Sequence, residues 1–278
     1  MSKLSIFTTC TINTPHRRDP WKEAIECYLD LADEVVIVTG HKDDQQEIEK
    51  AFPHEDRIKT LYIKWPYKWE WSELPKHLYE GFKHCTGDVA IKTDIDYFFH
   101  EDDHIKIRED LEKFLKDDEI VGRMLKVNIT RKDRGMIKSR TPIVINMNYK
   151  NKIRFGQASN KRTDWCEPLL VDNCCRGTAR AFDESENPLL RYWVYNYDYF
   201  FCTKEQVKEE FWRFAQAYAT AFGWDWGRSK EKAYSVWEGM QISRVSKSGE
   251  KINHPKYIKK RIDEMKPEEW GHSSFGLI

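Results

Sequence analysis

Asp94 and Asp96 form the only Asp-x-Asp pair in the sequence, and they follow a short apolar run that begins at Val89. Two carboxylates two residues apart at the end of a strand can jointly bind a hard divalent cation, which in turn can bind a diphosphate. The pair therefore points to nucleotide-sugar chemistry. The alternative is that both carboxylates only stabilise the start of a helix expected near Glu101.

The spacing of apolar residues predicts that strands and helices alternate in the region before this pair. The expected strands are residues 4–12, 34–39, 58–63 and 88–93, and the expected helices are residues 21–32, 45–52 and 73–85. Such alternation requires right-handed crossovers and a mostly parallel sheet, with ligands bound outside the carboxyl ends of the strands. The loops at residues 8–13 and 39–44 are therefore expected to share one crevice with Asp94 and Asp96.

Composition limits the classes of partner and of fold. The 278 residues include 46 Lys and Arg and 46 Asp and Glu, so the overall charge gives no reason to expect nucleic acid or an anionic membrane as a partner. No apolar run is long enough to span a bilayer. Seven cysteines without a Cys-x-x-C spacing argue against a disulfide framework or a zinc ribbon. We expect a soluble cytoplasmic protein and, because no segment reads as a linker, a single domain.

Residues 79–96 resemble the helix, Thr-Gly turn, strand and Asp-x-Asp pair of the GT-A glycosyltransferases, especially the family-2-like group. The resemblance implies a Rossmann-related α/β fold with a mostly parallel central sheet flanked by helices. Residues 1–103 would then bind a UDP- or GDP-linked sugar, and residues 104–278 would form a mixed, acceptor-binding half. In this family Mn²⁺ or Mg²⁺ joins the Asp-x-Asp pair to the diphosphate. The donor-binding residues expected on this basis are Thr8, Thr9, Thr11, Asp43, Lys92, Asp94 and Asp96.

Residues 236–252 are similar to a second family motif, an acidic group at the start of a helix that runs through an Arg and ends at a Gly before a strand. Glu238 occupies the position of the acceptor base, which must take a proton from the attacking hydroxyl. Asp225 is the substitute candidate for this base. His254 resembles the histidine that completes the metal site in some members. A solvated helix-face role for Glu238 and a turn or surface role for His254 stay open.

Aromatic and basic segments in the second half invite further predictions. Trp193, Trp224, Trp226 and Trp237 could stack on a sugar or pack in the core, and the glycine-flanked loop at residues 222–227 is the segment most suited to stacking. Residues 131–140 and 150–162 have the composition of solvated loops around a short strand at residues 142–147. Such basic loops could close over a departing nucleotide, or they could be mobile surface loops.

These observations together predict a metal-dependent glycosyltransferase that moves a sugar to a glycan or other hydroxyl acceptor with inversion. A sugar-phosphate nucleotidyltransferase could use the same sheet and acidic pair. It would need a glycine-rich loop after the first strand, and residues 8–18 contain no glycine. A non-catalytic carbohydrate- or nucleotide-binding module is the third reading, because it would keep the aromatic loop without metal-dependent turnover.

Overall fold

The first half of the chain forms a parallel sheet, as its alternating pattern predicts. A computed structural model describes residues 1–12, 14, 18–66, 73–156, 169–172, 174–177, 187–222, 228–247 and 249–265. Its first elements are β1 (Leu4–Cys10), α1 (Trp21–Leu31), β2 (Glu34–Thr39), α2 (Lys42–Ala51), β3 (Ile58–Tyr62), α3 (Glu73–His84) and β4 (Val89–Lys92). The four strands pair in parallel in the order β3-β2-β1-β4.

The second half adds mixed strands and the remaining helices. Its elements are β5 (Tyr97–Phe99), a 3₁₀ turn η1 (Glu101–Asp103), α4 (His104–Lys116), β6 (Val121–Arg131), β7 (Arg134–Asn146), η2 (Met147–Lys152), β8 (Ile153–Phe155), β9 (Leu169–Val171), β10 (Cys174–Gly177), β11 (Leu189–Asn196), α5 (Lys204–Phe222), α6 (Lys230–Ser246), β12 (Glu250–Lys251) and α7 (Lys256–Glu264). Among the described residues, β7, β6, β11 and β5 extend the sheet beyond β4, and β12 pairs with β7.

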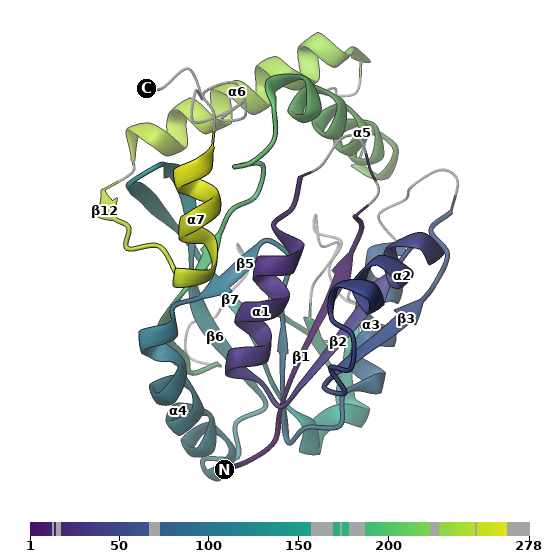
Figure 1. The fold of residues 1–278 in the computed structure, drawn as a ribbon, viewed down its shortest axis with the longest axis vertical. Helices are drawn as coiled ribbons and strands as arrows, with labels where there is room; N and C mark the ends of the chain where they lie inside the picture. The colour runs from purple at the N-terminus through teal and green to yellow at the C-terminus, as the bar shows by residue number, and fades with distance from the viewer. Residues whose placement is uncertain are drawn as a thin grey trace.

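Helices cover the sheet on both faces (Figure 1). One core cluster joins α1, α4 and α7 to the sheet, and its members include Tyr28, Phe99 and Ile258. The other face packs against α3 and the small β8-β9-β10 sheet through residues such as Phe82 and Ile153. The central strand β1 is buried along almost its whole length, because both faces of the sheet are covered.

Helices α5 and α6 pack on each other around a separate small core, which includes Phe211, Tyr234 and Trp237. Figure 1 shows the two helices across one end of the molecule, beyond the end toward which β1 runs. They therefore stand above the carboxyl ends of the parallel strands, where this class of fold binds its ligands.

The Thr-Gly turn before β4 has a steric reason. A Cβ atom at Gly87 would lie 2.7 Å from the backbone oxygen of Lys3 and 2.8 Å from the nitrogen of Ser5. Glu34 holds the same turn, because its carboxylate accepts hydrogen bonds from the backbone nitrogen of Thr86 (2.8 Å) and the hydroxyl of Ser5 (2.5 Å). This turn fixes where β4 begins, and hence where Asp94 and Asp96 follow it.

Three sequence predictions about the second half were wrong. Residues 131–140 are not a solvated loop, because β6 and β7 form a hairpin whose turn is only residues 132–133, and residues 134–140 belong to β7. Residues 150–152 belong to the 3₁₀ turn η2, and residues 153–155 form the short strand β8. Residues 157–162 lie outside the described part. Glu238 lies in the middle of α6 instead of at the start of a helix.

No helix in the described ranges combines the length and the apolar character that a membrane crossing requires.

Candidate functional site

One pocket of about 1020 Å³ opens at the carboxyl ends of the parallel strands. The end of β1 and the loop after it contribute Thr9 and Thr11, the first turn of α2 contributes Asp43, and the segment after β4 contributes Asp94 and Asp96. The structure thus brings five of the residues singled out in the sequence to a single cavity. Its volume is at the upper end of the range for small-molecule sites, which suits a ligand as large as a nucleotide-sugar.

The backbone around the acidic pair is fixed by hydrogen bonds. The carbonyl of Asp94 accepts from the hydroxyl of Tyr28 (2.7 Å) and from the nitrogen of Tyr97 (2.9 Å). The carbonyl of Asp96 accepts from the nitrogen of Tyr197 (3.1 Å). Burial raises the pKa of Tyr28 well above its ordinary value, so this hydroxyl remains a donor at every physiological pH. Both carboxylates are therefore carried by a preorganised segment.

The two carboxylates differ in exposure. Asp96 is 4% exposed, whereas the side chain of Asp94 is 38% exposed. Lys92 is itself buried and places its Nζ atom 3.3 Å from Oδ1 of Asp94. Lys92 is not among the residues that line the pocket, so it acts on the site through Asp94. Thr8 is also buried and outside the lining, and its hydroxyl donates to the carbonyl of Thr9 (3.2 Å).

The end of β11 and the segment after it meet the acidic pair from the second half of the chain. Asn196, Asp198 and Tyr199 line the pocket. The side-chain oxygen of Asn196 accepts a hydrogen bond from the nitrogen of Asp198 (3.0 Å), and its amide donates to Oδ1 of Asn128 (2.9 Å). Tyr199 has a φ of 61°, a left-handed conformation that costs a side-chain-bearing residue energy. This segment was not predicted from the sequence, although a polar Asn-x-Asp at the end of a strand was a usable signal.

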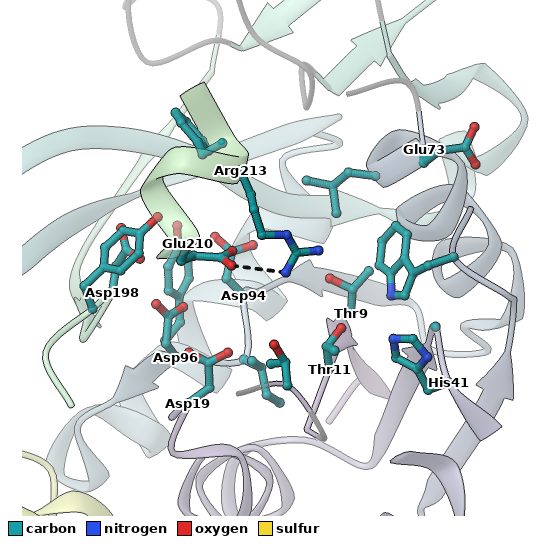
Figure 2. Close-up of a pocket in the computed structure, with 18 of the residues that line it drawn as sticks. Thr9, Thr11, Asp19, His41, Glu73, Asp94, Asp96, Asp198, Glu210 and Arg213 are labelled. Atoms are coloured by element: carbon teal, nitrogen blue, oxygen red, sulfur yellow. Dashed lines mark ion pairs between the residues drawn. The ribbon is translucent and has the colours of Figure 1, made fainter. Parts of the chain in front are cut away.

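Helix α5 closes the pocket from the opposite side with Glu210, Arg213 and Phe214. Arg213 forms an ion pair with Glu210 at 3.7 Å, and Figure 2 shows its guanidinium pointing into the pocket above Asp94 and Thr9. Asp19 lies with Asp96 and Asp198 at one side of the same view. The pocket thus holds both a concentration of carboxylates and a cationic group near them.

The predicted acceptor base does not reach this pocket. Glu238 lies on α6 outside the lining residues, and its Oε1 accepts a hydrogen bond from the hydroxyl of Tyr234 (3.2 Å). Asp225 lies outside the described residues, as do Trp224 and Trp226.

The structure also places the two other predicted tryptophans and the arginine of the second family motif. Trp237 is buried in the core between α5 and α6, and Trp193 packs against the main core. Burial lowers the pKa of Arg244, and the nearby carboxylate of Asp198 partly opposes this effect. The arginine of the second family motif therefore lies close to a carboxylate of the pocket, although the glutamate of that motif does not line it.

His254 does not join the acidic pair. Its Nδ1 atom accepts a hydrogen bond from the hydroxyl of Tyr197 (2.6 Å), and its Nε2 atom donates to the carbonyl of Lys132 (2.5 Å). Burial lowers the pKa of His254 and favours this neutral form. With both ring nitrogens engaged and no place in the pocket lining, His254 links β11 to the β6–β7 hairpin.

A second acidic cluster has a structural explanation. His100, Glu101 and Asp102 are the group of three ligating side chains that lie close together in the described ranges. Yet Nδ1 of His100 accepts from the nitrogen of Asp102 (3.2 Å), and Oε2 of Glu101 accepts from the nitrogen of Lys256 (2.9 Å). These contacts cap the start of η1 and attach α7, so the cluster serves the fold.

The donor atoms at Asp94 and Asp96 fit Mn²⁺ or Mg²⁺ bound together with a phosphate. Neither residue belongs to a compact group of three protein ligands in the described part of the chain. Mg²⁺ commonly uses one or two carboxylates and takes its remaining ligands from substrate phosphates and water. Two carboxylates at the wall of a large pocket match that requirement.

Comparison with known proteins gives structural likeness only. No family model matches the chain, and no curated protein matches it. A structure of TarS residues 1–349 from S. aureus has a TM-score of 0.41 at 14% identity and covers 87% of this chain and 81% of its own.

Two further solved structures resemble this chain at a similarly low level of identity and TM-score. The complex of TarS 1–349 with UDP-GlcNAc has a TM-score of 0.38 at 12% identity, with 87% and 73% of the two chains covered. A 4-diphosphocytidyl-2C-methyl-D-erythritol synthase from Anaerococcus prevotii has a TM-score of 0.40 at 15% identity, with 70% and 87% covered. These scores are below 0.5 and carry no argument about activity. The order of the parallel strands, the mixed extension of the sheet and the helices on both faces give this chain a GT-A-like, Rossmann-related α/β fold.

Proposed function

We propose that this protein is a metal-dependent glycosyltransferase that moves a sugar from a UDP- or GDP-linked donor to the hydroxyl of a glycan or another acceptor. The observation that carries the proposal is the common pocket of Asp94, Asp96 and the loops after β1 and β2. A donor laid across the carboxyl edge of the sheet would put its diphosphate near the acidic pair and its nucleoside near Thr9, Thr11 and Asp43.

Charge neutralisation of the leaving diphosphate falls to two kinds of group. Mn²⁺ or Mg²⁺, held by Asp94 and Asp96, would supply Lewis-acid stabilisation of the phosphate oxygens when bound. Arg213 points into the same region from α5 and can donate hydrogen bonds to phosphate oxygens as charge develops on them. Its ion pair with Glu210 restrains the guanidinium before the donor arrives.

The acceptor hydroxyl needs a base, and we assign this role to Asp198. Asp198 lines the pocket, and its backbone is held by Asn196, whereas Glu238 contacts Tyr234 outside the lining. In an inverting single displacement, the acceptor oxygen attacks the anomeric carbon while its proton passes to the Asp198 carboxylate. The bond to the diphosphate breaks on the opposite face, and its electron pair leaves with the phosphate oxygen.

Donor cleavage tests the proposal against its two rivals. The purified protein is incubated with UDP- and GDP-sugars and Mn²⁺, and the release of nucleoside diphosphate is measured with water and with simple sugars as acceptors. Release that requires Mn²⁺ and is lost in Asp96→Asn supports the transferase. Release of pyrophosphate from a nucleoside triphosphate and a sugar phosphate would favour a nucleotidyltransferase. Tight nucleotide binding with no turnover in either assay would favour a binding module.

A further inference from the structure

Trp65 forms part of the pocket wall just beyond the end of β3, at a position that the sequence analysis did not single out. The chain there continues alongside β2 after the regular strands end. The nitrogen of Ile63 donates to the carbonyl of Thr39 (2.9 Å), and the nitrogen of Trp65 donates to the carbonyl of Gly40 (3.2 Å). The backbone that carries the indole is thus attached to the sheet.

His77 of α3 supports one face of the indole. The two rings are stacked with centroids 3.7 Å apart and an interplanar angle of 17°. His77 is 1% exposed, and its ring nitrogens lie 2.8 Å from the carbonyl of Glu73 and 2.9 Å from that of Ile63. Because these contacts fix the imidazole, the indole has a rigid support.

Gly40 makes room for the same ring. A Cβ atom built on Gly40 would lie 1.3 Å from Cδ1 of Trp65 and 1.7 Å from its Nε1. The indole therefore occupies the space that any other residue at position 40 would fill with its side chain. Glycine is required here by this close approach.

We infer that Trp65 is the surface on which the base of the donor nucleotide stacks. The inference rests on the proposed function and adds a base-binding residue after the third strand to the loops after the first two. A flat aromatic ring that is held in place before the ligand binds loses little entropy on binding, and any nucleobase offers a face to stack on it. His41 and Asp43 lie in the same pocket and can bond the polar edge of the base.

The layout of the pocket agrees with this assignment. Figure 2 shows His41 on the side of the pocket opposite Asp96 and Asp198, with Thr9 and Thr11 between them. A nucleoside diphosphate could therefore place its base at the Trp65 end and its phosphates at the carboxylate end.

The test separates base binding from phosphate binding. Calorimetry with Mn²⁺ present measures the affinity of UDP, GDP and inorganic pyrophosphate for the wild-type chain and for Trp65→Ala, Trp65→Phe and Gly40→Ala. Trp193→Phe, on β11 outside the pocket lining, is the matched control. We expect Trp65→Ala to weaken nucleoside diphosphate binding about 5- to 100-fold. Pyrophosphate affinity should be unchanged, and Trp65→Phe should lose less.

Gly40→Ala keeps the indole but displaces it, so it should also weaken nucleotide binding and spare pyrophosphate. Wild-type affinity for nucleoside diphosphates in Trp65→Ala would overturn the inference and leave the proposed function standing. An equal loss for pyrophosphate would also overturn it, because it would indicate a general structural role for Trp65. Absence of any nucleotide binding by the wild-type chain would overturn the proposed function as well.

Discussion

At the scale of single residues, the question is which carboxylate acts as the acceptor base. Sequence similarity favours Glu238, whereas the pocket contains Asp198. We predict that Asp198→Asn lowers the transfer rate about 10²- to 10⁴-fold, because the acceptor proton then has no carboxylate to receive it. Nucleotide affinity should change little, since the base acts on the acceptor. Donor turnover and calorimetric nucleotide binding, measured on the same variant, separate the two effects.

Glu238→Gln is the comparison for this assignment. It replaces a carboxylate that lies outside the pocket lining and accepts a hydrogen bond from Tyr234, so we expect it to retain most of the transfer activity. The reverse pattern, with an inactive Glu238→Gln and an active Asp198→Asn, would return the role to Glu238. A product with retained anomeric configuration would contradict the single displacement itself.

At the scale of elements, α5 supplies one of the cations of the pocket, Arg213, and Lys42, Lys64 and Lys126 of other segments also line it. We predict that Arg213→Ala weakens the binding of nucleoside diphosphates and of pyrophosphate by about tenfold, because both ligands present the phosphate oxygens that the guanidinium would contact. Lys208→Ala is the control, since Lys208 lies on the same helix with its ammonium over the ring of Tyr234. Equal affinities for the Arg213 variant and the control in phosphate titrations would contradict this role.

The Thr-Gly turn that leads into β4 gives a second prediction for an element. Gly87→Ala should lower the free energy of unfolding by about 1–3 kcal/mol, because the new methyl group would overlap the backbone of Lys3 and Ser5. Gly239→Ala is the matched change within α6, where a Cβ atom would meet nothing within 4 Å. That variant should gain about 0.5–1 kcal/mol from helix propensity. Urea unfolding of both variants tests the contrast, and similar stabilities would refute it.

Element by element, the sequence predicted the first half of the fold better than the second. Val and Ile runs such as those in β2 mark strands that are buried on both sides, and their boundaries agree with the structure within a few residues. The basic composition of residues 131–140 predicts a loop, but β7 pairs with its hairpin neighbour β6 and with the distant β12, and this strand pairing outweighs local composition.

The sequence likewise predicted some of the pocket residues and not others. Asp94, Asp96, Thr9, Thr11 and Asp43 were found because they follow strands whose positions the sequence revealed. Asp198 and Arg213 were missed because their relevance depends on how the second half folds back over the sheet. Trp65 was missed because its position depends on its contacts with Gly40 and His77. Gly40, which admits the Trp65 ring, shows this limit plainly, since a single sequence does not reveal which side chain approaches a glycine.

At the scale of the whole molecule, two half-buried histidines make stability depend on pH. His254 links Tyr197 to Lys132, and His104 packs at the start of α4; burial lowers the pKa of both. At pH values between the pKa values of the folded chain and about 6.5, these two imidazoles are therefore protonated in the unfolded chain but neutral in the folded chain. Stability should be fully present above about pH 6.5 and fall as the pH drops through that value.

Thermal unfolding between pH 5 and pH 8 measures this dependence. His254→Asn should be less stable than the wild type at pH 8 by about 1–3 kcal/mol, because it loses the two hydrogen bonds of the imidazole ring. The difference should narrow at pH 5, since the variant lacks one of the groups that titrate. A difference that stays constant over this range would contradict a neutral, half-buried His254 in the folded chain.

The central claim concerns the whole pocket and is tested most directly by calorimetric titration of UDP and GDP, with Mn²⁺ present or chelated. The wild-type chain is compared with Asp96→Asn and with the control Asp88→Asn. Asp88 precedes the first residue of β4, far from Asp96 along the strand, and its exposed carboxylate accepts a hydrogen bond from the backbone nitrogen of Lys3. We predict that one nucleotide binds tightly, that chelation or Asp96→Asn weakens it at least 100-fold, and that Asp88→Asn does not. Binding that is indifferent to both the metal and Asp96, or no binding at all, would contradict the account.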